Sequence, residues 1–327
     1  MSFFSLSRQE YLFLTKESTF GQAVSPGNNN YCRHIKATMN NNRALLKRRD
    51  KTGDRSILKG IKGREVAQWT TQMSLVTSGS SSVPDCDVLL QMLFGDAPSG
   101  RTYTLSDLIV TGNLWRFRDP STLDQQVALG SVLQRATFTL GQDIAEWSAE
   151  GQALAVLGSN FFGAADTTQK GGLGSFPTRP SAPVANGDAI AGFTGQMTVD
   201  GITLATIRTA TIKVETGNAL VTDTFGSYYA TSAEGDERGV MFSFNLYDDD
   251  TTGAETIKEA ADSKAPITAT VQIGTVSNNI FTFTINGIQL ESPDLDDNQR
   301  RFVATYKDSP AHESSIGAKD EFSLVIT

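Results

Sequence analysis

The residue types that commonly carry catalysis are scarce in this chain. Its 327 residues include only two histidines, His34 and His312, and two cysteines, Cys32 and Cys86. No Ser or Cys lies in a nucleophile elbow or a cysteine-protease signature, so nucleophilic catalysis lacks its usual base. No Gly-x-x-x-x-Gly-Lys-Ser/Thr loop is present to hold phosphate groups. We therefore expect a protein that is not an enzyme, with both cysteines as buried thiols.

Two clusters of carboxylates have the composition of a cation site. They are Asp248-Asp-Asp250 and Asp294-Leu-Asp-Asp297. Both lack the ligand spacing and the glycine of an EF-hand loop, and neither histidine has a nearby partner of metal-ligand type. The clusters are typical of solvated turns, and we expect no metal and no cofactor.

The most concentrated charge in the sequence is positive. We call residues 43–64 the basic loop. This segment contains a dense set of cations and two acids, Asp50 and Asp54. The positive side chains are Arg43, Lys47, Arg48, Arg49, Lys51, Arg55, Lys59, Lys62 and Arg64. No aromatic residues alternate with them to stack on bases, which weakens a single-strand nucleic-acid interpretation.

The chain is acidic as a whole, but its halves differ in sign. Residues 1–157 contain 17 Lys and Arg against 14 Asp and Glu, whereas residues 158–327 contain 11 against 22. The two halves therefore offer opposite charge to whatever they touch. No stretch approaches the roughly 20 uninterrupted apolar residues of a membrane helix, so we expect no membrane partner.

Alternating apolar and polar residues predict β-strands, which must position any site. Residues 240–246 place their apolar side chains on one face, and Ser243 and Asn245 on the other. Residues 197–204 and 281–290 alternate in the same way around Asp-Gly and Asn-Gly. Because these dipeptides favour type I′ turns, both segments are predicted to form hairpins.

Two short helices and one linker complete the outline. Residues 84–94 and 254–264 have apolar residues at helical spacing. Gly, Ser and Pro are enriched in residues 158–192 without an apolar period, which indicates a linker or an extended arm. We therefore expect a first domain at 1–157 and a second at 193–327.

Three gapless alignments between the halves indicate an internal repeat. Residues 69–75 match 240–246, 42–46 match 217–221, and 129–133 match 286–290, in the same order along both halves. Identity between the segments is low, and a chance match is the alternative. We interpret them as two copies of one β-rich domain, each with a short flanking helix.

The counterpart of the basic loop in the second copy has the opposite charge. This segment, residues 218–238, is called the acidic loop below, and its acids are Asp223, Glu234, Asp236 and Glu237. A self-assembling chain could use equivalent loops of opposite charge to select which copy meets which. An ordinary solvated loop is the alternative for the basic loop.

Several segments resemble one protein family. Tyr11-Leu-Phe-Leu-Thr-Lys-Glu-Ser-Thr-Phe-Gly-Gln-Ala23 is similar to the amino-terminal signature of tail tube proteins of long-tailed bacteriophages. Four later segments are similar to the carboxy-terminal region of that family: Thr222-Asp-Thr-Phe-Gly-Ser-Tyr228, Pro293-Asp-Leu-Asp-Asp-Asn-Gln299, Tyr306-Lys-Asp-Ser-Pro-Ala-His312 and Lys319-Asp-Glu-Phe-Ser-Leu-Val-Ile326. Together they span most of the chain.

The resemblance implies two tandem β-sandwich or small-barrel domains that assemble into rings, which stack into the tube of a siphovirus-like tail. Six copies of the domain normally line each ring, so a chain with two copies implies a homotrimeric ring with pseudo-sixfold symmetry. The implied partners are a tape measure protein, a tail terminator, distal tail or baseplate proteins, and DNA that passes without specific binding. The implied location is the virion tail, after assembly in the host cytoplasm.

The sequence therefore predicts a structural virion protein, the major tail tube subunit, that forms the conduit for DNA ejection. An acidic wall suits a conduit because it repels phosphates, and the polar strand faces with Ser243, Asn245, Thr282 and Thr284 are candidates for the lumen. One alternative is a minor tube or hub protein at one end of the tail. Another is a nucleic-acid-binding module that uses the basic loop, and a carboxylate hydrolase lacks positive support.

Overall fold

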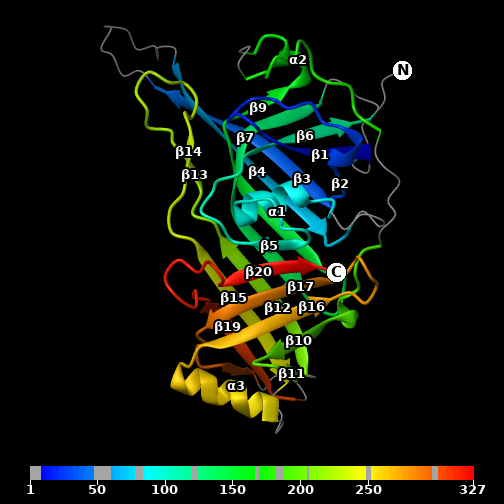
Figure 1. Cartoon of the computed structure of the whole chain (residues 1–327). Coiled ribbons are helices and arrows are strands. Elements are labelled where there is room, and N and C mark those ends of the chain that lie inside the picture. Colours follow the sequence, from blue (N-terminus) through cyan, green and yellow to red (C-terminus); the bar gives the residue numbers. More distant parts are fainter. Residues whose placement is uncertain are drawn as a thin grey trace.

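The computed structural model describes residues 9–47, 60–77, 84–119, 124–165, 169–181, 188–204, 206–247, 252–296 and 301–327 (Figure 1). The protein is mainly β, as predicted, with 48% of residues in strands and 11% in helices. The helices in these ranges are α1 (Asp87–Phe94), α2 (Ser159–Phe162) and α3 (Thr252–Ser263), and the 3-10 turns are η2 (Asn28–Asn30) and η3 (Gly192–Thr194). None of these helices is long and apolar enough to cross a membrane.

The first half of the chain forms two layers that share a strand. Its strands are β1 (Glu10–Lys16), β2 (Tyr31–Cys32), β3 (Lys36–Leu46), β4 (Ile61–Ser74), β5 (Thr102–Thr104), β6 (Gly112–Arg118), β7 (Gln126–Leu140), β8 (Glu146–Ala153) and β9 (Ala155–Gly158). The beginning of β7 pairs with β6 and β9, and its end pairs with β8. The layers are therefore β2-β1-β6-β7-β9 and β3-β4-β8-β7.

The second half forms two further layers. Its strands are β10 (Gln196–Val199), β11 (Ile202–Leu204), β12 (Ile207–Glu215), β13 (Ala219–Leu220), β14 (Ala233–Glu234), β15 (Gly239–Tyr247), β16 (Ile267–Ile273), β17 (Phe281–Ile288), β18 (Asp294–Asp296), β19 (Val303–Pro310) and β20 (Phe322–Ile326). The layers are β12-β15-β19-β18 and β11-β10-β16-β17-β20, and β5 of the first half extends the latter beside β20.

One antiparallel junction joins the halves. Residues 135–140 of β7 pair with residues 210–215 of β12. The result is a continuous run of strands, β3-β4-β8-β7-β12-β15-β19-β18, which we call the central sheet. Its long strands run through the middle of the molecule in Figure 1. The two predicted domains thus share a sheet.

The core lies between the central sheet and the layers that cover it. Phe138 of β7 stacks on Trp147 at a ring-centroid distance of 5.2 Å and contacts Phe283 of the second half at 5.0 Å. The strand predicted at residues 240–246 is confirmed as β15, with Val240, Phe242, Phe244 and Leu246 buried. Because every second side chain of a strand enters this core, the opposite face of the central sheet is left to polar residues.

One of the two predicted hairpins is confirmed and the other is wrong. β10 and β11 form a hairpin around Asp200 and Gly201, whose φ angles are 47° and 81°. Residues 281–288 instead run on as the single strand β17, between β16 and β20. Gly287, with φ 62°, lies at a shift of register rather than in a turn. The same positive φ that suits a type I′ turn also suits a glycine bulge.

Both predicted helices are present, and the segment predicted as a linker or arm packs on the first half. α1 and α3 coincide with the expected segments, and both cysteines are buried as expected. Within residues 158–192, Phe176 makes edge-to-face contacts with Trp115 and Phe117 at 5.2 and 5.8 Å. Arg179 lies 4.2 Å above the ring of Tyr11. Residues 166–168 and 182–187 lie outside the described residues.

The same series of antiparallel pairings occurs in both halves. In the first half, β1 pairs with β2 and β6, β6 with β7, β7 with β9, β3 with β4, and β4 with β8. In the second half, β10 pairs with β11 and β16, β16 with β17, β17 with β20, β12 with β15, and β15 with β19. A helix follows β4 in one half and β15 in the other.

Candidate functional site: a polar sheet face with two open edges

The face of the central sheet that points away from the core carries polar side chains on each of its strands. Alternation buries Trp69, Phe138, Ile212 and Phe242 on the core side. The same alternation places hydroxyl groups on the other side, one or more per strand from β3 to β15, and examples are Thr38, Thr70, Ser148, Thr137, Thr211 and Ser243. We call this side the polar face.

An ion-pair network lies at the β8-β7-β12 part of the polar face. Arg135 pairs across strands with Glu150 and with Glu215, and its guanidinium lies 2.8 Å and 3.0 Å from their carboxylates. The Nζ of Lys213 is 3.0 Å from the Oε1 of Glu215. The hydrogen bond from Lys213 and then that from Arg135 lower the pKa of Glu215, so this carboxylate is ionised at neutral pH.

Further charges of the polar face lie on β19, β18, β8 and β3. Lys307 of β19 pairs with Asp294 of β18 at 2.5 Å. Glu146 of β8 accepts a hydrogen bond of 2.8 Å from Gln72. Lys36 of β3 is exposed and has no ion pair among the described residues. The polar face is therefore mixed in charge, with carboxylates set beside cations.

The four predicted lumen residues do not share one face. Ser243 and Asn245 lie on the polar face, where Ser243 accepts from the backbone N–H of Asp308 at 2.9 Å and Asn245 accepts from Thr209 at 3.0 Å. Thr282 and Thr284 belong to β17 in the covering layer. Because Phe283 of that strand points towards Phe138 in the core, the two threonines point away from the central sheet.

The central sheet ends in two strands with one open edge each. Among the described residues, β3 pairs with β4 alone and β18 pairs with β19 alone. Lys36 stands on the polar face of β3, and Asp294 and Asp296 stand on that of β18. An open strand edge presents unpaired N–H and C=O groups that can join a second chain.

Most of the basic loop lies outside the described residues. Arg48, Arg49, Lys51, Arg55 and Lys59 are among those not described. Arg43 and Lys62 lie within β3 and β4, which form the base of the loop, and Lys47 is exposed at the end of β3. Arg64 in β4 donates a hydrogen bond to the backbone carbonyl of Thr224.

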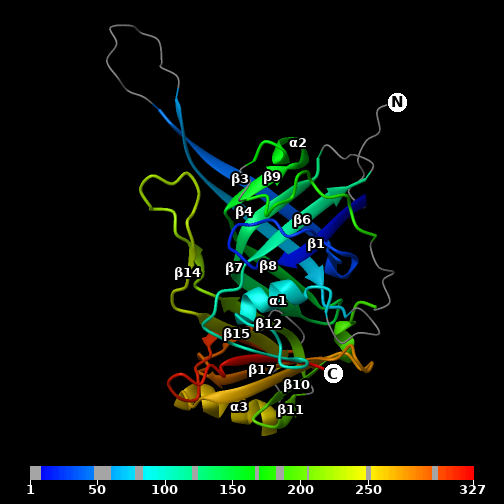
Figure 2. The same cartoon turned by 45° about the horizontal axis from the view of Figure 1, so that its top comes forward.

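The acidic loop lies against the base of the basic loop in the same chain (Figure 2). Besides the bond from Arg64 to Thr224, the hydroxyl of Tyr228 is 3.3 Å from a carboxylate oxygen of Glu65. β13 and β14 close the loop on itself, with Glu234 in β14. These two contacts with β4 thus use the backbone carbonyl of Thr224 and the hydroxyl of Tyr228, and not the acids Asp223, Glu234, Asp236 and Glu237.

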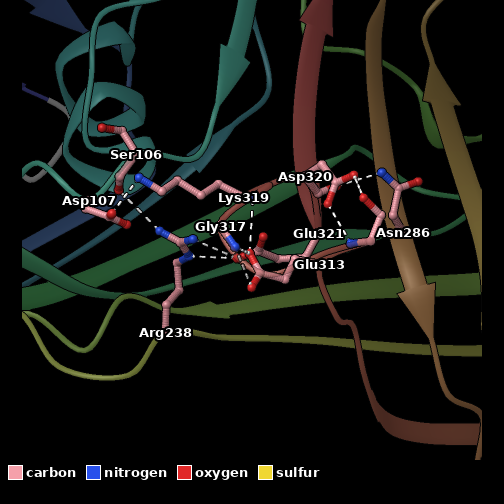
Figure 3. Close-up of polar contacts among 10 residues, drawn as sticks. Ser106, Asp107, Arg238, Asn286, Glu313, Gly317, Lys319, Asp320 and Glu321 are labelled. Atoms are coloured by element: carbon pink, nitrogen blue, oxygen red, sulfur yellow. Dashed lines mark hydrogen bonds and ion pairs between the residues drawn. The ribbon is translucent and has the colours of Figure 1, made fainter.

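A cluster of charged residues ties the two halves together beside α1 (Figure 3). Arg238 forms an ion pair of 2.7 Å with Glu321 and donates to the carbonyl of Ser106 at 3.2 Å. Lys319 lies 2.5 Å from Asp107, and this hydrogen bond lowers the pKa of Asp107. The sequence did not indicate this cluster, because its members lie far apart along the chain.

The amino-terminal motif has a structural role centred on Glu17. One carboxylate oxygen of Glu17 accepts from the N–H of Gly130 at 2.7 Å and the other from the N–H of Gly21 at 3.0 Å. Thr111 and Asn113 donate to the same carboxylate. Burial raises the pKa of Glu17 to about 7. The Lys-Glu-Ser-Thr-Phe-Gly segment therefore secures a bulge of β7, which sequence reasoning missed.

Both histidines contact neighbouring strands. His34 lies 3.4 Å from Glu10, which also pairs with Arg118 at 2.8 Å. His312 donates its backbone N–H to the carbonyl of Gly287 at 3.2 Å. The described residues contain no group of three or more His, Cys, Asp or Glu placed to hold a metal ion.

No protein-family model matches the chain, and no curated protein matches its sequence.

Proposed function

We propose that this chain is a structural subunit that joins copies of itself head to tail into rings, which stack into the tail tube of a siphovirus-like bacteriophage. The observation that carries the proposal is the relation between the β7–β12 junction and the open edges of the central sheet. The resemblance of the amino- and carboxy-terminal segments to tail tube proteins supplies the biological setting.

The first support is an internal repeat, which we take as a tandem duplication. The same strand pairings and the same helix position recur in both halves. Two of the three pairs of matching segments fall in corresponding strands: 69–75 and 240–246 at β4 and β15, and 129–133 and 286–290 in β7 and at the end of β17. Of the third pair, 42–46 lies in β3, whereas 217–221 follows β12 and includes β13. Chance seldom produces agreement in pairing, order and sequence at once.

The second support is that the junction inside the chain can be repeated between chains. In the proposed duplication, β3 corresponds to β12. The end of β7 corresponds to β18, because the end of β7 pairs with β8 in the first half and β18 pairs with β19 in the second. The β7–β12 pair inside one chain thus corresponds to two strands that each have an open edge, β18 of one chain and β3 of the next. Such a heterologous contact generates a ring when the rotation closes.

Three chains would supply six units around the axis of each ring. The polar face would then line the lumen, because the opposite side of the central sheet is committed to the core. A lining of hydroxyl groups, amides and paired charges suits the passage of DNA during ejection. This role implies tape measure, terminator and distal tail proteins as partners. It also implies the virion tail as the location.

Negative-stain microscopy of the purified full chain tests the proposal. The proposal predicts long hollow tubes. Isolated rings that never stack would favour a minor tube or hub protein at one end of the tail, and a protein that stays monomeric at high concentration would contradict self-assembly.

A further inference from the structure

The cations near the centre of the polar face are already held by carboxylates of the same chain. The Nη1 of Arg135 is 2.8 Å from Glu150, and its Nε and Nη2 are 3.1 Å and 3.0 Å from Glu215. Lys213 shares the same oxygen of Glu215 at 3.0 Å. Two cations thus face two carboxylates, and the local group is electrically neutral.

These side chains are accessible to a ligand on the face. Between 32% and 47% of each side chain is exposed across Arg135, Lys213, Glu150 and Glu215. An exposed arginine with free donors is the side chain best suited to bind phosphate, because its planar fork matches the phosphate oxygens. Each such contact strengthens DNA binding through the release of counterions.

From this geometry we propose that Glu150 and Glu215 are internal counter-ions that prevent the polar face from retaining DNA. The proposal rests on the function proposed above and names the residues that let a polyanion slide. A phosphate that approached Arg135 would have to displace a carboxylate already bound to the guanidinium, and it would meet the negative charge of that carboxylate at contact distance.

Local pairing explains weak retention better than the net charge of the chain. At about 0.1 M salt a distant charge is screened beyond roughly 10 Å. The cations at the wall would still meet phosphates at contact distance, where screening has little effect. Carboxylates within 3.1 Å of the same cations act at that short range.

The test compares two double variants of the full chain with equal change in charge. Glu150→Gln with Glu215→Gln removes the counter-ions, and Glu255→Gln with Glu259→Gln on α3 removes two exposed carboxylates away from the polar face. Binding of a fluorescent DNA duplex is followed by anisotropy from low to high salt. Because every variant keeps the same basic loop, the contribution of that loop cancels in the comparison.

We expect the first variant to bind DNA about tenfold more tightly than the wild type at low salt, with a salt dependence steeper by about one phosphate contact or more. The α3 variant should bind like the wild type. Adding Arg135→Gln and Lys213→Gln to the first variant should abolish the gain, because these are the cations that the phosphates would contact. Equal binding by the two double variants would overturn the proposal.

Tube formation is recorded separately for each variant by microscopy. If tubes form but the counter-ion variant binds DNA no better than the α3 variant, this inference fails and the proposed function stands. If the wild type forms no rings, the proposed function fails whatever the DNA result. If the double variant loses the β-sheet signal in circular dichroism, the single Glu215→Gln variant, which frees Lys213, is measured in its place with the same two outcomes.

Discussion

Gly130 of β7 and Gly287 of β17 lie at the same place in the two halves, each with a positive φ, 57° and 62°. The residue after each glycine lies at a shift of register. Ser131 pairs with Gly112 and Ile288 pairs with Ile267, and beside each of these pairs the ladder shifts by one residue. Glycine bulges bend a strand and redirect it. Their repetition is what the proposed duplication requires.

Gly287→Ala should destabilise the protein more than an alanine at an open glycine. A Cβ at Gly287 would lie 2.3 Å from the carbonyl oxygen of His312 and would also meet a positive φ, whereas Gly226, with φ 85°, has nothing within 4 Å. We expect a loss of about 1 kcal/mol for Gly226→Ala and at least twice that for Gly287→Ala, measured by denaturant unfolding. Equal losses would show that the close approach of the backbone is relieved at no cost.

Glu17 should make stability depend on pH. Its pKa is about 7 in the folded chain, above its ordinary value of 4.5, so the protonated form favours folding. This contribution is complete below about pH 4.5 and is lost as the pH rises through 7, a fall of about 3 kcal/mol. Glu17→Gln should flatten this part of the stability profile, with Glu259→Gln as the exposed control. The same fall in wild type and Glu17→Gln would remove Glu17 as its source.

The open edges should pair with a defined charge relation. Lys36 on β3 would face the carboxylates of β18 in the next chain, so Lys36→Glu should weaken ring formation, measured by native mass spectrometry, and a second change, Asp296→Lys, should restore it in part. Arg101→Glu, an exposed reversal of the same kind, serves as the control. Unaltered rings in the Lys36→Glu variant would argue against this edge as the contact.

The basic loop should act in the stacking of rings. Reversal of Lys47, Arg48 and Arg49 to Glu should shorten the tubes seen by microscopy. The free energy of unfolding should stay within about 1 kcal/mol of the wild type if these charges act between rings and not within the fold. Tubes of normal length would refute a role of the basic loop in assembly.

Much of the secondary structure follows from the sequence because alternation marks a strand wherever one face is buried. β15 and the β10–β11 hairpin are found in this way, and α1 and α3 by helical spacing. The prediction of a turn at Asn286-Gly287 was wrong because a positive φ occurs in a bulge as well as in a turn. Local pattern gives the dihedral preference, and the partner strand decides between the two.

The polar-face network could not be predicted from the sequence because it depends on strand register. Arg135, Glu150 and Glu215 meet because β7 lies between β8 and β12, and a shift of one residue would send each side chain to the core. Likewise, Glu17 contacts Gly130 because β1 pairs with β6 and β6 pairs with β7. Thr282 and Thr284 have the same local pattern as Ser243 and Asn245, and only the layer order separates them.

A reconstruction of the assembled protein by electron cryo-microscopy tests self-assembly most directly. The account predicts a hollow tube whose rings each contain three chains, with β18 of one chain beside β3 of the next and the polar face towards the lumen. Rings of six chains, or an assembly in which β3 and β18 remain unpaired, would contradict it.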